Sequence, residues 1–144
     1  MTVTEDAKKK VALFLKEFYT QANVGAGGSS TNPSSNALDV PILTTLSTTS
    51  NTTSDVATVD FTAILAGSSV TGNTLREFGI FGEMPQDDQF DEMRLEGVQI
   101  TGSTATNGTE ATVETIMLGR VNFDGVGPFA ASDEIEFTYT VEVE

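Results

Sequence analysis

Apolar and polar residues alternate strictly over residues 134–144, at the end of the chain. Such alternation predicts a β-strand with one buried side and one side in water. Residues 55–66 follow the same pattern and predict a second strand of this kind. The apolar positions are Ile135, Phe137, Tyr139, Val141 and Val143 in the first stretch and Val59, Phe61, Ala63 and Leu65 in the second.

The densest apolar stretch is residues 75–83, Leu-Arg-Glu-Phe-Gly-Ile-Phe-Gly-Glu. Its bulky residues, including Phe78 and Phe81, occupy both sides of an extended chain, which predicts a central strand buried on both faces. Residues 37–49 and 111–123 predict further strands, and Phe123 is an apolar position of the second.

Residues 2–22 have helical rather than alternating periodicity. The predicted cap is either Thr2, with Glu5 in a capping box, or Thr4. We expect the Phe14 and Phe18 side of this helix to pack on a sheet or on a partner. The apolar face comprises Val11, Phe14, Leu15, Phe18, Tyr19 and Ala22, and the lysines expected on the wet side are Lys8, Lys9, Lys10 and Lys16.

One amphipathic helix followed by six to eight short strands predicts a mainly β fold, an antiparallel β-sandwich of jelly-roll-like form. The expected organisation is a helix over residues 1–22 and a single sandwich domain over 23–144. An acidic insert occupies about residues 83–110. Its spacing does not match a calcium-binding loop, so we interpret it as a solvated acidic segment.

A glycine-rich stretch follows the helix, with Gly25, Gly27 and Gly28 near its start. A phosphate-binding loop would need a preceding strand, a following helix and a Gly-Lys-Ser/Thr sequence, and none is predicted here. We therefore interpret residues 23–36 as a connecting loop.

The composition narrows the possible functions. The formal charge is −14, which argues against nucleic acids and anionic membranes as partners. The chain has no Cys and no His, and no catalytic constellation is evident. We predict a non-enzymatic protein without a cofactor. The acidic, lysine-poor, threonine-rich composition is typical of proteins in high salt, which screens such repulsion; the alternative is an ordinary acidic protein.

Three segments occur in a recognisable order. The first is Val-Gly-Ala-Gly at 24–27, followed by Asn-Pro at 32–33 and Leu38. The second is Leu-Arg-Glu-Phe-Gly-Ile-Phe at 75–81, and the third is Met-Leu-Gly-Arg-Val-Asn-Phe at 117–123 before the final strand. Together they resemble a family of small virion proteins of tailed phages that includes tail-collar, tail-fibre and head-decoration proteins. The acidic insert departs from that pattern.

The resemblance implies a structural protein located in the virion. It would form a capsid decoration or turret, or a tail or baseplate fibre base, as a trimer or pentamer of copies together with other virion proteins. Contact with a host surface is compatible with this role. Combined with the composition, it favours a tailed virus of a halophilic archaeon. The alternative function is a carbohydrate- or calcium-dependent cell-surface binding module.

Glu77 and Arg120 are charged residues within otherwise apolar strands, so we predict that they pair across the sheet or at a subunit junction. Gly79 is expected where a neighbouring group approaches closely. The segments predicted to attach the protein to partners are the helix, through Lys8, Lys9, Lys10, Phe14 and Phe18, and the glycine stretch, through Gly25 and Gly27.

Overall fold

The computed structural model describes residues 1–28, 35–52, 57–85, 100–101, 104–105 and 113–144. Over these ranges the protein is mainly β, with one α-helix. Six strands form one antiparallel sheet in the order β7-β4-β1-β2-β3-β8, and β5 pairs with β6 separately. The elements are α1 (Glu5–Phe18), β1 (Gln21–Gly25), β2 (Pro41–Thr52), β3 (Thr58–Ala66), β4 (Leu75–Pro85), β5 (Ile100–Thr101), β6 (Thr104–Ala105), β7 (Val113–Val126) and β8 (Glu134–Glu142), with a short 3₁₀ turn at Gly67–Ser69.

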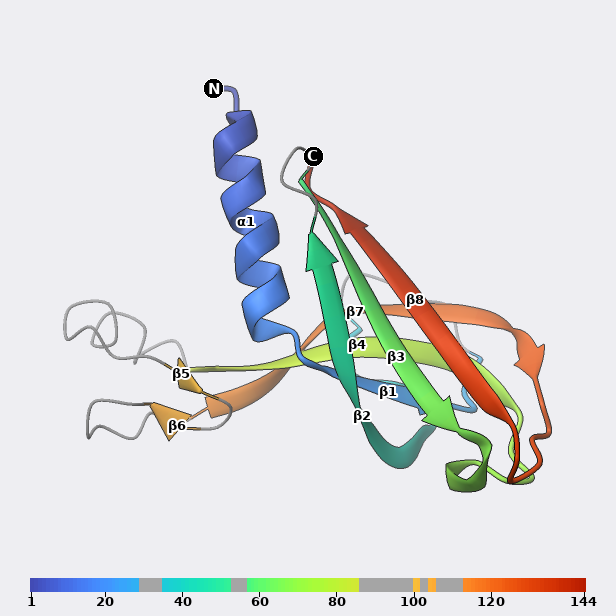
Figure 1. Ribbon diagram of the computed structural model, residues 1–144. Coiled ribbons are helices and arrows are strands. Elements are labelled where there is room, and N and C mark those ends of the chain that lie inside the picture. Colours follow the sequence, from blue (N-terminus) through green and yellow to red (C-terminus); the bar gives the residue numbers. More distant parts are fainter. Residues whose placement is uncertain (29–34, 53–56, 86–99, 102–103, 106–112) are drawn as a thin grey trace.

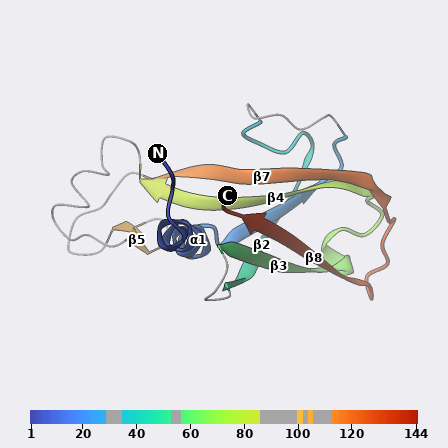
Figure 2. The ribbon, with the colours of Figure 1, turned by 90° about the horizontal axis from the view of Figure 1, so that it is seen from above.

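The six-stranded sheet is strongly curled, and β2 makes the bend. Residues 41–47 of β2 pair with β1, whereas residues 48–52 pair with β3. The half formed by β7, β4 and β1 therefore faces the half formed by β3 and β8, with crossing strand directions (Figures 1 and 2). The mainly β, antiparallel prediction is confirmed, but a jelly-roll sandwich is not: the two halves belong to one continuous sheet.

The core lies inside this curl. Phe61, at the centre of β3, is fully buried, and Phe78 of β4 is 3% exposed. Phe78 stacks on Phe137 of β8 with ring centroids 4.7 Å apart, and Phe123 of β7 lies 6.0 Å from the same ring. These rings join the two halves of the sheet, which confirms the packing positions predicted for Phe78 and Phe123.

The strands with the strongest patterns are present. In β3 the buried side chains are Val59, Phe61, Ala63 and Leu65, as the alternation predicts. Among the described strands, β8 pairs with β3 alone, and its side chains alternate between partly buried and exposed. β4 is buried on both faces, because Glu77, Phe78, Gly79 and Ile80 are all buried. Most of the predicted acidic insert, 83–110, lies outside the described residues, although Glu83 to Pro85 belong to β4.

The start of the sheet was mispredicted. The helix was expected to reach residue 22 and the stretch from 23 was expected to be a loop, but β1 begins at Gln21. Ala22 and Val24 are fully buried while Gln21 and Asn23 are not, which is a strand pattern. Five residues are too few for this period to stand out beside a helical pattern, and β1 is stabilised by pairing with both β2 and β4.

The N-terminal helix also differs from its prediction. It begins after Thr4, whose hydroxyl accepts a hydrogen bond from the Ala7 amide. It packs on the sheet through Ala12, Leu15, Phe18 and Tyr19. The Phe14 and Phe18 side was expected to pack on a sheet or on a partner. Phe14 is 41% exposed, so packing on the sheet does not hold for this residue. The ring of Phe14 instead lies against Phe18, with centroids 4.6 Å apart.

Candidate functional site

Glu77 is a fully buried carboxylate in the middle of β4. Its side chain leaves β4 on the outer face of the curl, opposite the face on which Phe78 meets Phe137. Gly25 of β1 lies beside it in register. A buried carboxylate destabilises a fold unless it is paired and hydrogen-bonded, so its partners define this site.

Three backbone amides donate hydrogen bonds to Glu77. The amides of Gly27 and Val40 donate to Oε1 over 3.1 and 2.9 Å, and the amide of Asp39 donates to Oε2 over 3.0 Å. All three belong to the described parts of the β1–β2 connection, residues 26–28 and 35–40, which we call the strap. Hydrogen bonds to an ionised acceptor are stronger than neutral ones. Glu77 therefore holds the strap against the outer face of β4.

Arg120 of β7 completes this arrangement. Its Nη1 lies 3.3 Å from Glu77 Oε2 and 3.3 Å from Asp39 Oδ1, and its side chain is 3% exposed. Nη1 also lies 3.5 Å from the Ala37 carbonyl oxygen. The predicted pairing of Glu77 with Arg120 across the sheet is thus present within one chain. We call Glu77, Arg120 and Asp39 with their strap contacts the carboxylate clamp.

Asp39 was not predicted as a member of the clamp. It lies 38 residues before Glu77 and 81 before Arg120 in a polar stretch, and nothing in its local pattern marks it. The three side chains come together only in the folded chain. The pairing of β4 with β7 sets Gly79 opposite Arg120, and the strap brings Asp39 back over β4. The sequence feature nearest to Asp39 is Leu38, the last position of the first segment that carries the family resemblance.

Gly25 and Gly27 make room for this carboxylate. A Cβ atom at Gly25 would lie 2.7 Å from the Val40 carbonyl oxygen, and one at Gly27 would lie 2.7 Å from Glu77 Oε1. The expectation of a plain connector is therefore wrong for these two residues, and Gly25 is the last residue of β1. The amide of Gly27 does face an anion, but that anion is the carboxylate of Glu77.

Gly79 has the close contact that was predicted for it. An added Cβ atom would lie 3.0 Å from Leu38 of the strap and 3.0 Å from the ring of Phe81. Leu38 is 7% exposed in this position. The outer face of β4 thus carries, in order, the Glu77 carboxylate, the small Gly79 under Leu38, and Phe81. Phe81 packs beside the strap rather than inside the curl.

The helix lysines do not form an isolated basic patch. Lys8 Nζ lies 2.9 Å from Glu5, and Lys9 Nζ lies 4.0 Å from Asp6. The hydrogen bond from Lys8 lowers the pKa of the Glu5 carboxyl below its ordinary value. Lys8 is also not fully in water, since its side chain is 22% exposed. Lys10 is exposed, as expected.

The carboxylate clamp can position a strap, and its two enclosed members, Glu77 and Arg120, cannot contact a substrate. In the part of the chain that is described, no group of three or more metal-ligating side chains occurs. No helix among the described residues is long and apolar enough to cross a membrane.

Comparison with models of protein families and with curated proteins found no match to this sequence. The class that the fold and the clamp define is a mainly β protein with a curled antiparallel sheet and one packed helix.

Proposed function

We propose that this protein is a non-enzymatic structural component of a virus particle, a capsid decoration or turret or a tail or baseplate fibre base, that assembles with copies of itself. The observation that carries this proposal is an uncovered apolar side of α1. Val11 and Phe14 are 45% and 41% exposed, one helical turn apart, and Val3 just before the helix is 51% exposed. Contiguous exposed apolar side chains mark interaction surfaces.

A closed symmetric oligomer accounts for this surface, because equivalent helices around an axis bury the same side chains in every copy. In Figure 1 the helix stands beside β2, with its C-terminal end at the β1, β4 and β7 half and its N-terminal end pointing away from that half. The assignment to a virus particle rests on the resemblance of the three segments. The proposal that the virus infects a halophilic archaeon rests on the charge of −14.

Light scattering in multimolar KCl tests the assembly. We expect a trimer or a pentamer, and we expect Phe14→Asp to convert it to a monomer with an unchanged circular dichroism spectrum, because a charge would have to be buried at the helix contact. Ile64→Asp is the matched control: Ile64 is 54% exposed and belongs to β3, not to α1, and its replacement should leave the mass unchanged. A monomeric parent protein contradicts the proposal.

The salt-adaptation part has its own test. At a formal charge of −14, self-repulsion destabilises the compact state, and the Debye length falls from about 10 Å at 0.1 M to about 3 Å at 1 M salt. We expect the melting midpoint to rise steadily from dilute buffer to multimolar KCl. A midpoint that is flat or that falls with salt rules out adaptation to high salt while leaving the assembly proposal intact.

A further inference from the structure

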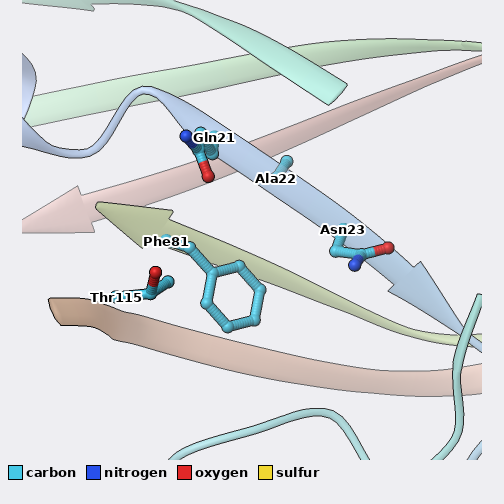
Figure 3. A pocket seen from close by; sticks show the side chains of 5 residues that line it. All are labelled: Gln21, Ala22, Asn23, Phe81 and Thr115. Atoms are coloured by element: carbon cyan, nitrogen blue, oxygen red, sulfur yellow. The ribbon is translucent and has the colours of Figure 1, made fainter. Parts of the chain in front are cut away.

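A pocket of about 270 Å³ lies on the outer face of the sheet, next to the carboxylate clamp. It spans three neighbouring strands, since Gln21, Ala22 and Asn23 belong to β1, Phe81 to β4 and Thr115 to β7 (Figure 3). Phe81 is paired with Gln21 in register, and Glu77 of the clamp lies four residues earlier on the same face of β4. None of the roles discussed above uses this pocket.

The polar side chains of the pocket are available for a ligand. Asn23 Oδ1 accepts a hydrogen bond from the Val24 amide over 2.8 Å, which orients the carboxamide and leaves its Nδ2 as a donor. Among the described contacts, the side chains of Gln21 and Thr115 have no hydrogen-bond partner. Figure 3 shows Gln21 and Asn23 on one side of the Phe81 ring and Thr115 on the other. Donors and acceptors therefore surround an aromatic ring.

The position of the Phe81 ring is fixed by Gly79 and Leu38. The ring lies over Gly79, where a side chain would collide with it, and Leu38 fills the other side of the same glycine. The clamp holds Leu38 there by fixing the amides of Asp39 and Val40. The ring is only partly buried and forms an apolar wall of the pocket. An aromatic wall with ordered polar neighbours suits a ligand that has both an apolar face and hydroxyl groups.

Charge selects among such ligands. Among the described residues, the side chains that line the pocket are all uncharged, although the chain carries 21 acidic residues. An anion would find no cationic partner in this lining and would meet the field of a strongly acidic protein. Glu83, which pairs with Thr115 in register, places a carboxylate beside the pocket but not in its lining. The volume is slightly below the roughly 300–1,000 Å³ of pockets for drug-sized ligands. The site therefore fits one small, neutral, polyhydroxylated ring.

We propose that this pocket binds a neutral pyranose sugar. The C–H face of the sugar packs on Phe81, and its hydroxyl groups exchange hydrogen bonds with Gln21, Asn23 Nδ2 and Thr115. This goes beyond a structural role, because it places a saccharide-contacting site on the protein, and it does not depend on the oligomeric state.

The test is an NMR titration of the full chain with glucose, galactose, mannose and N-acetylglucosamine, each to high millimolar concentration. At least one should shift the side-chain amide signals of Gln21 and Asn23 and saturate, while N-acetylneuraminic acid, a charged sugar, should not. Gln21→Ala should weaken binding about fivefold through the loss of one hydrogen bond. Phe81→Leu should weaken it further by removing the aromatic wall.

Thr138→Ala is the control, because Thr138 is exposed on β8 and lies outside the pocket. Gln21 is only partly buried, so Gln21→Ala should keep the parent spectrum even if Phe81→Leu alters packing. The proposal is overturned if no neutral sugar shifts these signals, or if binding is the same in Gln21→Ala as in Thr138→Ala. A shift with N-acetylneuraminic acid alone also overturns it.

Discussion

Glu77→Gln is expected to lower the free energy of unfolding by about 3–5 kcal/mol, the usual cost of breaking a buried ion pair from one side. Each carboxylate oxygen of Glu77 accepts from backbone amides or from Arg120. Either orientation of a glutamine would turn its NH₂ group toward two of these donors. Denaturant unfolding in multimolar KCl measures the loss.

Two further variants make this expectation specific. Glu83→Gln changes the same residue type on the same strand, at a site that is only partly buried, and should alter stability by no more than about 0.5 kcal/mol. Adding Arg120→Met to Glu77→Gln should cost less than the sum of the single changes, because the two residues share one interaction. A Glu77→Gln protein as stable as the parent would show that the clamp does not stabilise the fold.

Glu77→Gln should also increase local opening of the strap more than it increases opening of the rest of the sheet. In Glu77→Gln the amides of Gly27, Asp39 and Val40 lose the carboxylate, and the glutamine carbonyl can replace only one of its two oxygens. The hydrogen exchange of these amides should therefore accelerate more than that of β3 amides near Phe61. Hydrogen exchange under native conditions measures this difference. Equal acceleration everywhere would mean that the strap and the rest of the sheet open as one unit.

Gly25→Ala is the second change with a large expected effect, about 1–3 kcal/mol of destabilisation from overpacking. Its methyl group would lie 2.7 Å from the Val40 carbonyl oxygen and 2.8 Å from Cδ of Glu77. Neither group can withdraw easily, since Val40 is backbone and Glu77 is held by the clamp. The strap would be pushed away from β4, and the unfolding midpoint in denaturant should fall.

Gly28→Ala provides the matched control. Gly28 lies three residues after Gly25, in the strap, and an added Cβ atom there would lie 4.0 Å from Cδ of Arg76, an ordinary contact. Its stability should stay within about 0.5 kcal/mol of the parent. If Gly25→Ala lowers the stability as little as Gly28→Ala does, the close approach of β1, the strap and Glu77 is not required for folding.

Local patterns predicted the strands well where one face of a strand is buried and the other is exposed. The alternations of β3 and β8 were read correctly because a period of two repeats over nine residues in each. The pair of Glu77 with Arg120 could be predicted for a different reason: a charge inside an apolar strand needs a partner, and few opposite charges were available. The patterns did not reveal β1, because five residues following a helix carry too little periodicity.

The positions of Phe14 and Phe81 could not be derived from the sequence. Helical periodicity shows which side chains share a side, but α1 meets the sheet through Ala12 and Tyr19, and this leaves Phe14 in water. In β4, alternation separates Phe81 from Phe78, yet only the strap and the curl decide which face is the core. A polar pocket formed by side chains from β1, β4 and β7 has no signal in any single segment.

By itself the sequence determined the mainly β character, the buried central strand, the need of Glu77 for a partner and the strong negative charge. These features follow from the spacing of apolar residues along short segments, from the type of single residues, and from the sum of the charges over the whole chain. Only the tertiary structure decided that the sheet is continuous and bends at β2, that Asp39 joins the clamp, and that the glycines accommodate an internal carboxylate. Those features depend on contacts between segments up to 83 residues apart, from Ala37 to Arg120, and local patterns do not encode such contacts.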